Sequence, residues 1–234
     1  NCILNSGYFP EIWREGLIIA LHKQGSHNNV SNYRGITLLS ALSKLFTRIL
    51  NNRLTSWAES YSVYIDSQSG FRSGFSTVDK IYVLHGAISY FLNKGKQLYA
   101  AFVDFRKAFD FINRDILWYK LLKLGVRGRI FNIIQDMYNT VKTRVKGLDG
   151  QVSEESFECL LGVRQGESLS PFLFAMYIND MEEFLLQQSF EGISLVNLKL
   201  LLLLYADDAV ILSETAEDMQ KGLDCLKTYC VKYK

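Results

Sequence analysis

The amino-acid sequence predicts an α+β protein in which an antiparallel sheet packs against helices on one face. Several long segments carry apolar residues at steps of three and four, which is the spacing of amphipathic helices. Short apolar runs at residues 98–103, 200–204 and 209–212 are typical of strands. The predicted order is helices, one strand, helices, a pair of strands and a final helix, and this order favours the α+β class.

The first third of the chain is predicted to form two strands and then two helices. An apolar run at residues 17–21 and a β-capable run at residues 36–39 are the strands. From Ser40 the apolar residues repeat at helical spacing, and a second helix is expected to begin at Thr77 as its N-cap. The apolar positions of the first helix are Leu42, Leu45, Phe46, Ile49, Leu50 and Leu54, and those expected to face inward on the second are Ile81, Leu84, Ile88 and Phe91 or Leu92.

The remaining elements are predicted from the same signals. The continuous apolar run at residues 98–103 indicates a strand that is covered on both faces and that ends at Asp104. Hydroxyl and proline residues mark helix starts, and glycine marks helix ends. The further predicted elements are helices over residues 114–124 (ended by Gly125), 129–138, 170–187 (begun by Ser170-Pro171) and from the N-cap Thr215 onward, and a hairpin over residues 141–157 with its turn at residues 147–150.

Composition narrows the classes of protein that need to be considered. The 234 residues are 48% hydrophobic, which is enough to bury a core without disulfides. A formal net charge of +2 excludes a histone-like chain and does not by itself indicate a nucleic-acid partner. No apolar run is long enough for a membrane span, and the four cysteines have no metal-ligand spacing, so we expect a reduced, intracellular chain. Because it has no initiator methionine, we expect a fragment of a longer protein.

Three aspartates carry the chemistry. Asp207 and Asp208 lie between two apolar strands, where adjacent carboxylates repel each other unless a cation neutralises them. Asp104 ends another strand, and carboxylates from neighbouring strands can hold two Mg²⁺ ions for in-line phosphoryl transfer. A tight turn is the other interpretation of the doublet, and Asp104 favours the metal site. Since adjacent strand residues face opposite ways, Asp207 is the stronger candidate of the doublet.

Five motifs in order resemble those of reverse transcriptases, in the form found in the non-LTR (LINE-type) retrotransposon branch. Two resemble the catalytic strands of the palm, one resembles the segment that contacts template and nucleotide, and two resemble the fingers. In chain order they are Asn32-Tyr33-Arg34-Gly35-Ile36-Thr37-Leu38-Leu39, residues 68–77, residues 101–110, residues 162–171 and Tyr205-Ala206-Asp207-Asp208.

The resemblance implies a right-hand polymerase fold, with a palm and a mainly helical fingers subdomain. Residues 1–97 would be the fingers and residues 98–234 the palm, and the thumb would lie beyond the chain. Asp104 and Asp207 would bind both Mg²⁺ ions, for which Mn²⁺ could substitute. Asp208 would assist them, and the backbone carbonyl of Phe105 would complete the metal shell.

The resemblance also implies residues that bind the incoming nucleotide. Arg34 would bind the triphosphate, with Lys23 assisting, although a lone lysine is usually a solvated one. Phe109 would exclude the ribose 2′-hydroxyl, or it is an ordinary core aromatic. Gln165 would contact the nucleotide, and Gly166 would let the backbone approach it, or would simply make the loop flexible.

Two further features concern charge. Glu167 and Ser168 stand where relatives commonly have a small or apolar residue and a proline, and an acid beside the nucleotide pocket has no evident use. Lys142, Arg144 and Lys146 belong to a locally basic stretch that can neutralise nucleic-acid phosphates. The alternative interpretation of these three residues is an edge strand that is protected by charge.

The predicted function is RNA-directed DNA polymerase, with an RNA template, a DNA primer and deoxynucleoside triphosphates as partners, no membrane, and work in the nucleus. The chain alone is expected to be inactive without a thumb. The alternatives are an inactive RNA-binding remnant, a group II intron maturase and an RNA-directed RNA polymerase. Phe109 argues against the last, and the fingers motif at Arg34 favours the retrotransposon branch. Oligomeric state is left open.

Overall fold

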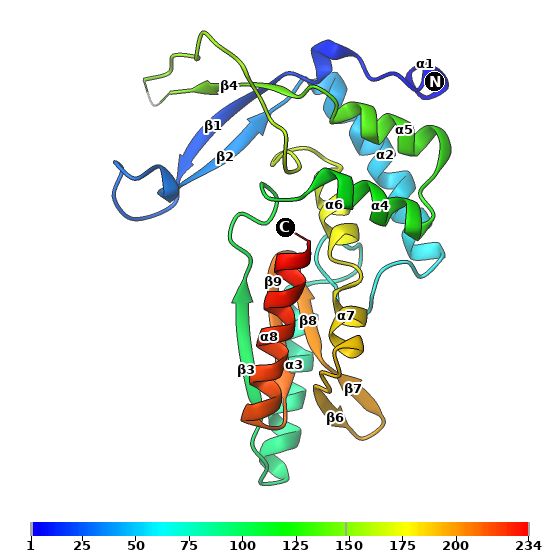
Figure 1. Ribbon diagram of the computed structural model, residues 1–234, viewed down its shortest axis with the longest axis vertical. Coiled ribbons are helices and arrows are strands. Elements are labelled where there is room, and N and C mark those ends of the chain that lie inside the picture. Colours follow the sequence, from blue (N-terminus) through cyan, green and yellow to red (C-terminus); the bar gives the residue numbers. More distant parts are fainter. Residues whose placement is uncertain (1, 148, 234) are drawn as a thin grey trace. The chain divides into compact units, whose positions relative to one another are not determined.

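The computed structural model describes residues 2–147 and 149–233 (Figure 1), so Leu148 of the predicted turn lies outside the described residues. The chain divides into two compact units, each built from two separate stretches of sequence. Unit 1 contains the described residues of 1–57 and 109–173, and unit 2 contains those of 58–108 and 174–234. Fingers and palm are divisions by role, and their predicted boundary at residue 97 stays a prediction.

Unit 1 is built around a four-stranded sheet with the strand order β2-β1-β4-β5. Strand β1 pairs antiparallel with β2 and parallel with β4, and β4 pairs antiparallel with β5. The predicted strands at residues 17–21 and 36–39 and the predicted hairpin at residues 141–157 are thereby confirmed. The elements of this unit are α1 (Cys2–Ser6), β1 (Gly16–His22), β2 (Tyr33–Leu38), most of α2 (Ala41–Ser60), α4 (Arg114–Leu124), α5 (Gly128–Met137), β4 (Lys142–Lys146) and β5 (Phe157–Glu158), with short 3₁₀ turns at Glu11–Trp13 and Val30–Asn32.

Local signals account for the ends of α4. The Asn113 side chain accepts hydrogen bonds from the backbone N–H groups of Asp115 and Ile116, which would otherwise lack partners in the first turn. At the other end Gly125 has φ = 104°, the left-handed conformation that ends a helix at little cost in a residue without Cβ. The predicted bounds of this helix are confirmed.

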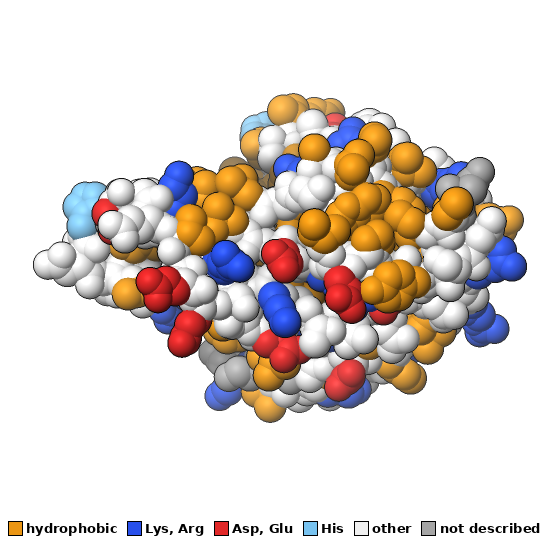
Figure 2. Space-filling view, turned by 90° about the horizontal axis from the view of Figure 1, so that it is seen from above, with side chains coloured by type: hydrophobic (Ala, Val, Ile, Leu, Met, Phe, Trp, Pro, Cys, Tyr) orange, Lys and Arg blue, Asp and Glu red, His pale blue; other side chains and the backbone are white. Residues whose placement is uncertain are grey.

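The buried side of α2 differs from the expected one. Leu50 and Leu54 are buried, but Leu42, Leu45 and Ile49 are between 45% and 60% exposed. The fully buried small residues Ser43 and Thr47 share the side of Leu50 and Leu54 instead. The apolar stripe therefore predicts the helix correctly. Of the side chains that it predicts to be buried, only some are buried in the structure. Figure 2 shows hydrophobic side chains gathered on one face of the molecule.

Unit 2 is built around a three-stranded antiparallel sheet with the strand order β3-β9-β8, and a second hairpin, β6–β7, stands apart from it. The sequence did not predict the β6–β7 hairpin, whose turn residue Val196 has φ = 54°. The elements are α3 (Thr77–Asn93), β3 (Tyr99–Asp104), the second half of α6 (Ser170–Tyr177), α7 (Met181–Gln187), β6 (Ile193–Leu195), β7 (Leu198–Leu200), β8 (Leu202–Tyr205), β9 (Asp208–Ser213) and α8 (Ala216–Lys232).

The sheet of unit 2 carries helices on both faces, whereas the sequence predicts helices on one. Helix α3 packs against one face through Ala87 and Phe91, which form a core cluster with Leu203 and Leu212. Helix α8 packs against β9 and β3, and Figure 1 shows it on the opposite side from α3. Of the expected inward positions of α3, Leu84 and Phe91 pack toward the sheet, whereas Ile81 and Ile88 are 63% and 39% exposed, because Ala87 lies on the buried side instead.

Three other expectations for unit 2 are wrong in detail. Strand β3 is not covered on both faces: it is an edge strand, and the side chain of Phe102 is 74% exposed. The helix predicted over residues 170–187 is interrupted between α6 and α7, where the Asn179 side chain bonds to the backbone of Val63 and Ile65. The start of α3 is set by a capping box of Ser76 and Asp79, so the N-cap is Ser76 and not Thr77.

Within residues 2–147 and 149–233, no helix is both long enough and apolar enough to cross a membrane. The four cysteines all fall in the described part of the chain and are free thiols.

Candidate active site

Two of the three predicted catalytic carboxylates lie directly opposite one another in unit 2. Asp104 is the last residue of β3 and Asp208 is the first residue of β9, and they are partners in the antiparallel register. Residues opposite one another in such a pair point to the same face of the sheet, with side chains a few ångströms apart. Both side chains are exposed to solvent. The fold therefore forms a pair of carboxylates at one end of the sheet.

Asp207 lies in the turn between β8 and β9. Tyr205 and Asp208 are the last paired residues, so Ala206 and Asp207 form a two-residue hairpin turn, in which Ala206 has φ = 58°. The turn interpretation of the doublet is therefore confirmed, and the metal site stays a prediction. Because the turn ends at Asp208, it is Asp208 that stands opposite Asp104, although the sequence favours Asp207.

The arrangement suits a magnesium ion that keeps part of its water shell. Mg²⁺ is usually held by one or two carboxylates together with water and substrate phosphates, and Asp104 and Asp208 supply such a pair. Among the described residues, no three His, Cys, Asp or Glu side chains converge to form a closed cage for an ion. The carbonyl of Phe105 follows Asp104 directly, at the end of β3.

The carboxylate pair borders a groove of about 380 Å³ within unit 2. Asp104, Asp208 and Tyr205 line it together with apolar residues of the sheet and one side of α3. Lys80 also lines the groove, and its ammonium group donates a hydrogen bond to the carbonyl oxygen of Asp66 (3.0 Å). Partial burial lowers the pKa of Lys80 from its usual value.

The other predicted site residues belong to unit 1, and four of them share one face of its sheet. Arg34 of β2 is the register partner of Leu21 in β1. Leu17 and Ile19 alternate with Leu21 along β1 and are the partners of Arg144 and Lys146 in β4. Because partners and alternate residues point to one face, Arg34 lies on the same face as Lys142, Arg144 and Lys146. We call these four residues the basic face.

Lys23 directly follows β1. Its backbone N–H donates to the carbonyl oxygen of Asn32 (2.8 Å), which extends the β1–β2 hairpin by one hydrogen bond beyond the strands. Lys23 and Arg34 therefore come from adjoining strands of the same hairpin.

Phe109, Gln165 and Gly166 are brought together in unit 1. The carbonyl oxygen of Phe109 accepts a hydrogen bond from the backbone N–H of Val163 (2.8 Å). The Gln165 side chain donates from Nε2 to Oδ1 of Asp110 (3.2 Å), and its carbonyl oxygen accepts from the N–H of Thr37 (2.8 Å). This loop is thereby joined to β2, three residues from Arg34.

The backbone packing around position 166 requires a glycine there. Its φ is 107°, and a Cβ atom at this position would lie 2.7 Å from the carbonyl oxygen of Thr37. Any other residue would push the loop away from β2. The loop-flexibility interpretation is therefore insufficient, because glycine is required by close backbone packing here.

Glu167 does not project into solvent beside Gln165: it is 3% exposed and accepts a hydrogen bond from the hydroxyl of Tyr138 (3.2 Å). Burial raises the pKa of this carboxyl, against the opposing effect of the nearby Arg164 guanidinium. Its Oε1 atom is buried without a hydrogen-bond partner among the described residues. Glu167 is therefore a buried residue of the interior and does not line the nucleotide pocket through an exposed carboxylate.

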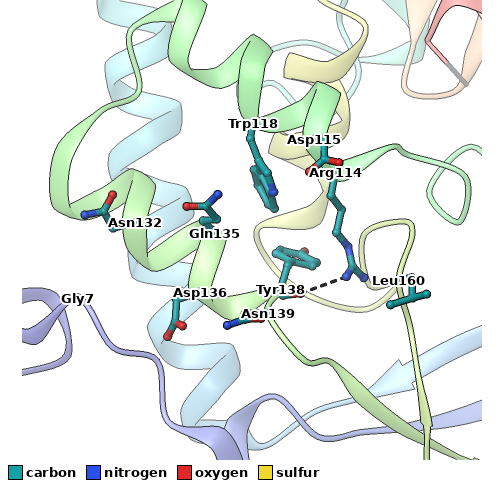
Figure 3. Close-up of a pocket in the computed structure, with 10 residues that line it drawn as sticks. All are labelled: Gly7, Arg114, Asp115, Trp118, Asn132, Gln135, Asp136, Tyr138, Asn139 and Leu160. Carbon is teal, nitrogen blue, oxygen red and sulfur yellow. Dashed lines mark hydrogen bonds between the residues drawn. The ribbon is translucent and has the colours of Figure 1, made fainter.

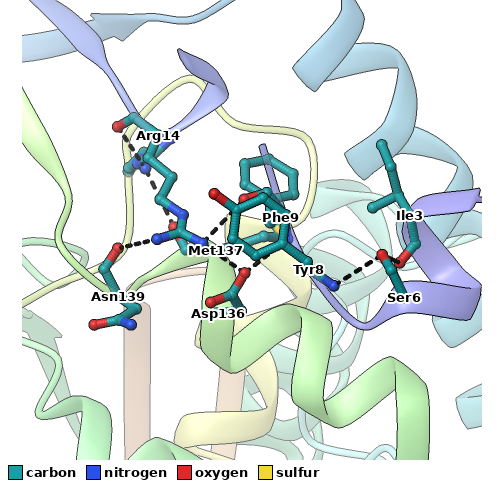
Figure 4. A network of polar contacts seen from close by, with 9 residues as sticks. Ile3, Ser6, Tyr8, Phe9, Arg14, Asp136, Met137 and Asn139 are labelled. Atoms are coloured by element: carbon teal, nitrogen blue, oxygen red, sulfur yellow. Dashed lines mark hydrogen bonds and ion pairs between the residues drawn. The ribbon is translucent and has the colours of Figure 1, made fainter. Parts of the chain in front are cut away.

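Arg164 ties the same loop to the rest of unit 1. Its guanidinium donates to the carbonyl oxygens of Arg14 (2.9 Å) and Met137 (3.3 Å). Arg14 in turn forms an ion pair with Asp136 at 2.6 Å, in the network that Figure 4 shows. The Arg164-Gln165-Gly166 motif is therefore held by backbone contacts on both sides of Gln165.

A different cavity of unit 1, of about 570 Å³, lies between α4 and α5 (Figure 3). Arg114 and Tyr138 line it, and Arg114 donates to the carbonyl oxygen of Tyr138 (3.1 Å). None of the predicted site residues lines this cavity, so its size alone gives it no catalytic role.

Sequence reasoning gave Gln68 no individual role. In the structure its side chain bonds to the backbone of Ala206, within the turn between β8 and β9. Gln68 is the first residue of the motif at residues 68–77. Its place in that motif was the one feature of the sequence that could have indicated a role for it. The resemblance places this motif in the fingers, but the residues belong to unit 2.

The carboxylate pair and the basic face are features expected of an α+β nucleotidyl-transfer polymerase, and comparison with known proteins agrees with that class. The family described as "Reverse transcriptase (RNA-dependent DNA polymerase)" matches residues 21–234. The chain belongs to the reverse transcriptase family.

Its relatives are proteins of non-LTR retrotransposons. It is 30% identical to the "Probable RNA-directed DNA polymerase from transposon BS" of Drosophila melanogaster, over 100% of this chain and 26% of that protein. It is 29% identical to the "Retrovirus-related Pol polyprotein from type-1 retrotransposable element R2" of Popillia japonica, over 89% of this chain and 29% of that protein. The chain thus spans about a quarter of the length of these relatives.

Solved structures agree on the fold. Apo telomerase from Candida tropicalis has a TM-score of 0.63 at 17% identity, covering 96% of this chain and 44% of that one. The telomerase of Candida albicans, solved with an RNA fragment, has a TM-score of 0.59 at 14% identity, covering 94% of this chain and 42% of that one. The predicted α+β polymerase fold is confirmed.

Proposed function

We propose that this chain is the nucleotidyl-transfer part of an RNA-directed DNA polymerase encoded by a non-LTR retrotransposon. The observation that carries the proposal is the register pair of Asp104 and Asp208, with Asp207 next to it in the turn, in a chain of the reverse transcriptase family. The reaction joins the 3′-hydroxyl of a DNA primer to a deoxynucleoside triphosphate on an RNA template and releases pyrophosphate.

Asp104, Asp207, Asp208 and the carbonyl of Phe105 are the groups that would hold the divalent ions. Bound Mg²⁺, or Mn²⁺ in its place, lowers the pKa of the primer hydroxyl and stabilises the charge that develops on the transferred phosphate. Asp104 and Asp208 are exposed at the end of the sheet, so ions can keep the open positions that substrate oxygens need.

The unit 1 residues bind and select the nucleotide. The planar Arg34 guanidinium can bind two phosphate oxygens at once, and Lys23, in the adjoining strand of the hairpin, adds a second positive charge. Gln165 contacts the nucleotide from a loop that Gly166 holds against β2. Phe109, joined to the same loop, occupies the space of a ribose 2′-hydroxyl and favours deoxynucleotides.

The three β4 residues of the basic face bind the template–primer backbone. Lys142, Arg144 and Lys146 alternate along β4, so their positive charges lie on a single side of the strand. Charges placed in this way neutralise phosphates and give no sequence preference of their own. A retroelement polymerase of this branch works on chromosomal DNA, and we therefore place its action in the nucleus. In this assignment residues 1–97 act as fingers and residues 98–234 as palm.

The test uses the full-length protein with an RNA template, a DNA primer, deoxynucleoside triphosphates and Mg²⁺. The wild type is expected to extend the primer, and Asp207→Asn is expected to reduce the rate by roughly 100- to 1,000-fold with an unchanged melting temperature. A wild-type protein that binds RNA but does not extend the primer would contradict the proposal and favour the inactive RNA-binding remnant.

A further inference from the structure

We propose that Gln68 is the positioning residue that fixes the turn carrying Asp207 and Asp208. Gln68 is 1% exposed and belongs to unit 2, as do Ala206 and the carboxylates. It touches none of the reacting groups, and it acts through the Ala206 backbone. The catalytic side of this inference rests on the proposed function.

The Gln68 amide forms hydrogen bonds with both backbone polar groups of Ala206. Its Oε1 atom accepts from the N–H of Ala206 (3.1 Å), and its Nε2 atom donates to the carbonyl oxygen of Ala206 (3.2 Å). Oε1 also accepts from the N–H of Gly70 (2.6 Å). Ala206 is 9% exposed and stands in the turn, beyond the last ladder pair, so Gln68 supplies the partners that the ladder does not.

The turn needs such support because of its backbone conformation. Ala206 has φ = 58°, in the left-handed region that a residue with a Cβ atom adopts reluctantly. Such a conformation persists only where the surroundings hold it. The two hydrogen bonds from Gln68 hold the Ala206 peptide groups on either side of the strained residue, and Asp207 and Asp208 follow directly.

The segment that carries Gln68 lies against β8 like a short additional strand. The N–H of Leu204 donates to the carbonyl oxygen of Ser67 (2.8 Å), and the N–H of Ser69 donates to the carbonyl oxygen of Leu204 (3.0 Å). Gly70 lies so close that a Cβ atom there would be 2.0 Å from the backbone nitrogen of Ala206. Glycine is therefore required at residue 70 for the segment to reach the turn.

The same segment is itself held from three other sides. Asn179 accepts from the N–H of Ile65 and donates to the carbonyl oxygen of Val63. Ser67 donates to a carboxylate oxygen of Glu182 (2.9 Å). Arg72 donates to the carbonyl oxygen of Gln68 (3.1 Å) and pairs with Glu59 at 2.8 Å. Gln68 thus transmits the rigidity of this segment to the turn.

Gln68→Met tests the inference, because methionine has a similar length and cannot form either hydrogen bond. In the full-length protein, we expect kcat to fall by about 10- to 100-fold, since small displacements of reacting groups have effects of this size. The KM for deoxynucleotides and the Kd for template–primer should change by less than about threefold, because the unit 1 residues are untouched. The Mg²⁺ concentration for half-maximal activity should rise.

Two further variants separate positioning from general stability. Ala206→Gly removes the penalty of a positive φ, so the double variant with Gln68→Met should recover part of the lost kcat. Gln187→Met changes an exposed glutamine of α7 that bonds to Glu183, and it should leave kcat and the Mg²⁺ requirement unchanged. Equal losses in kcat, binding and melting temperature, without recovery in the double variant, would overturn the inference.

Measurements that do not depend on enzymatic activity can test the role of Gln68 independently of the proposed function. Hydrogen exchange of the peptide over residues 204–208 should be slow in the wild type and faster in Gln68→Met, because the Ala206 N–H loses its acceptor. Mn²⁺ affinity measured by electron paramagnetic resonance should weaken in the same variant. Unchanged exchange overturns the role of Gln68. Faster exchange in Gln68→Met, together with a wild-type protein that cannot extend a primer, would overturn only the polymerase assignment.

Discussion

Asp104 and Asp208 are the terminal pair of the β3–β9 ladder, so two carboxylates face each other where the sheet ends. Like charges in directly opposite positions of a sheet are destabilising. A fold keeps such a pair only where it serves another purpose, and the purpose that we propose here is the binding of divalent cations. Stability and activity should therefore respond in opposite directions when the pair is broken.

Asp208→Asn should raise the free energy of unfolding by about 0.2–1 kcal/mol, because it removes one charge of a like-charged pair. The same change should reduce primer extension strongly, since it removes a ligand for the ions. Urea denaturation and an extension assay measure the two effects. Asp224→Asn, on the exposed surface of α8, is the control and should change neither. A loss of stability in Asp208→Asn would contradict the paired arrangement.

Phe109→Val should admit ribonucleotides. Removing the aromatic ring opens space for a 2′-hydroxyl, and discrimination against ribonucleotides should fall by roughly 10- to 200-fold, the range typical of a changed pocket. The ratio of kcat/KM for deoxynucleotides to that for ribonucleotides measures it. Phe111→Val changes an exposed aromatic nearby and is the control, with an unchanged ratio. An unchanged ratio in Phe109→Val would leave Phe109 as an ordinary packing residue.

Replacing Lys142, Arg144 and Lys146 together by alanine should weaken template–primer binding for all sequences equally. The slope of log K against log salt should become shallower by roughly 2–3, because each lost phosphate contact contributes roughly 0.7–0.9. Binding measured from low to moderate salt gives the slope. Lys227→Ala, on the exposed surface of α8, should leave it unchanged. A uniform slope across all variants would contradict this role, and the edge-strand interpretation is already excluded because β4 lies between β1 and β5 in the sheet.

Glu167 should make stability fall as pH rises. Burial raises the pKa of this carboxyl in the folded state above its unfolded value, so the folded chain holds the proton longer. The folded state is therefore relatively favoured below the ordinary glutamate pKa and loses that advantage as pH rises through the raised pKa. Glu167→Gln keeps an acceptor for the Tyr138 hydroxyl and cannot ionise. The stability of the wild type minus that of Glu167→Gln should fall with rising pH, as measured by urea unfolding at several pH values. A difference that rises with pH would contradict this assignment.

Local signals in the sequence predict most of the elements. Asn113 and Gly125 define α4 because a side-chain cap and a left-handed glycine act within one turn of the helix. The same holds for Thr215, which accepts from the N–H of Asp218 at the start of α8. The exposed side of β3 could not be predicted, because Phe102 is apolar whether or not another element covers it.

The candidate site also has features that the sequence predicts and features that only the tertiary structure shows. The sequence by itself determined which residues are the candidates for the chemistry, because strand ends at Asp104 and at the Tyr205-Ala206-Asp207-Asp208 turn are local features, and so is the composition of the motifs. Only the tertiary structure decided that Asp208 is the partner of Asp104 and that Gln68 supports Ala206. Register and side-chain contacts between residues more than a hundred positions apart depend on how whole elements pack, and no short stretch of sequence encodes them.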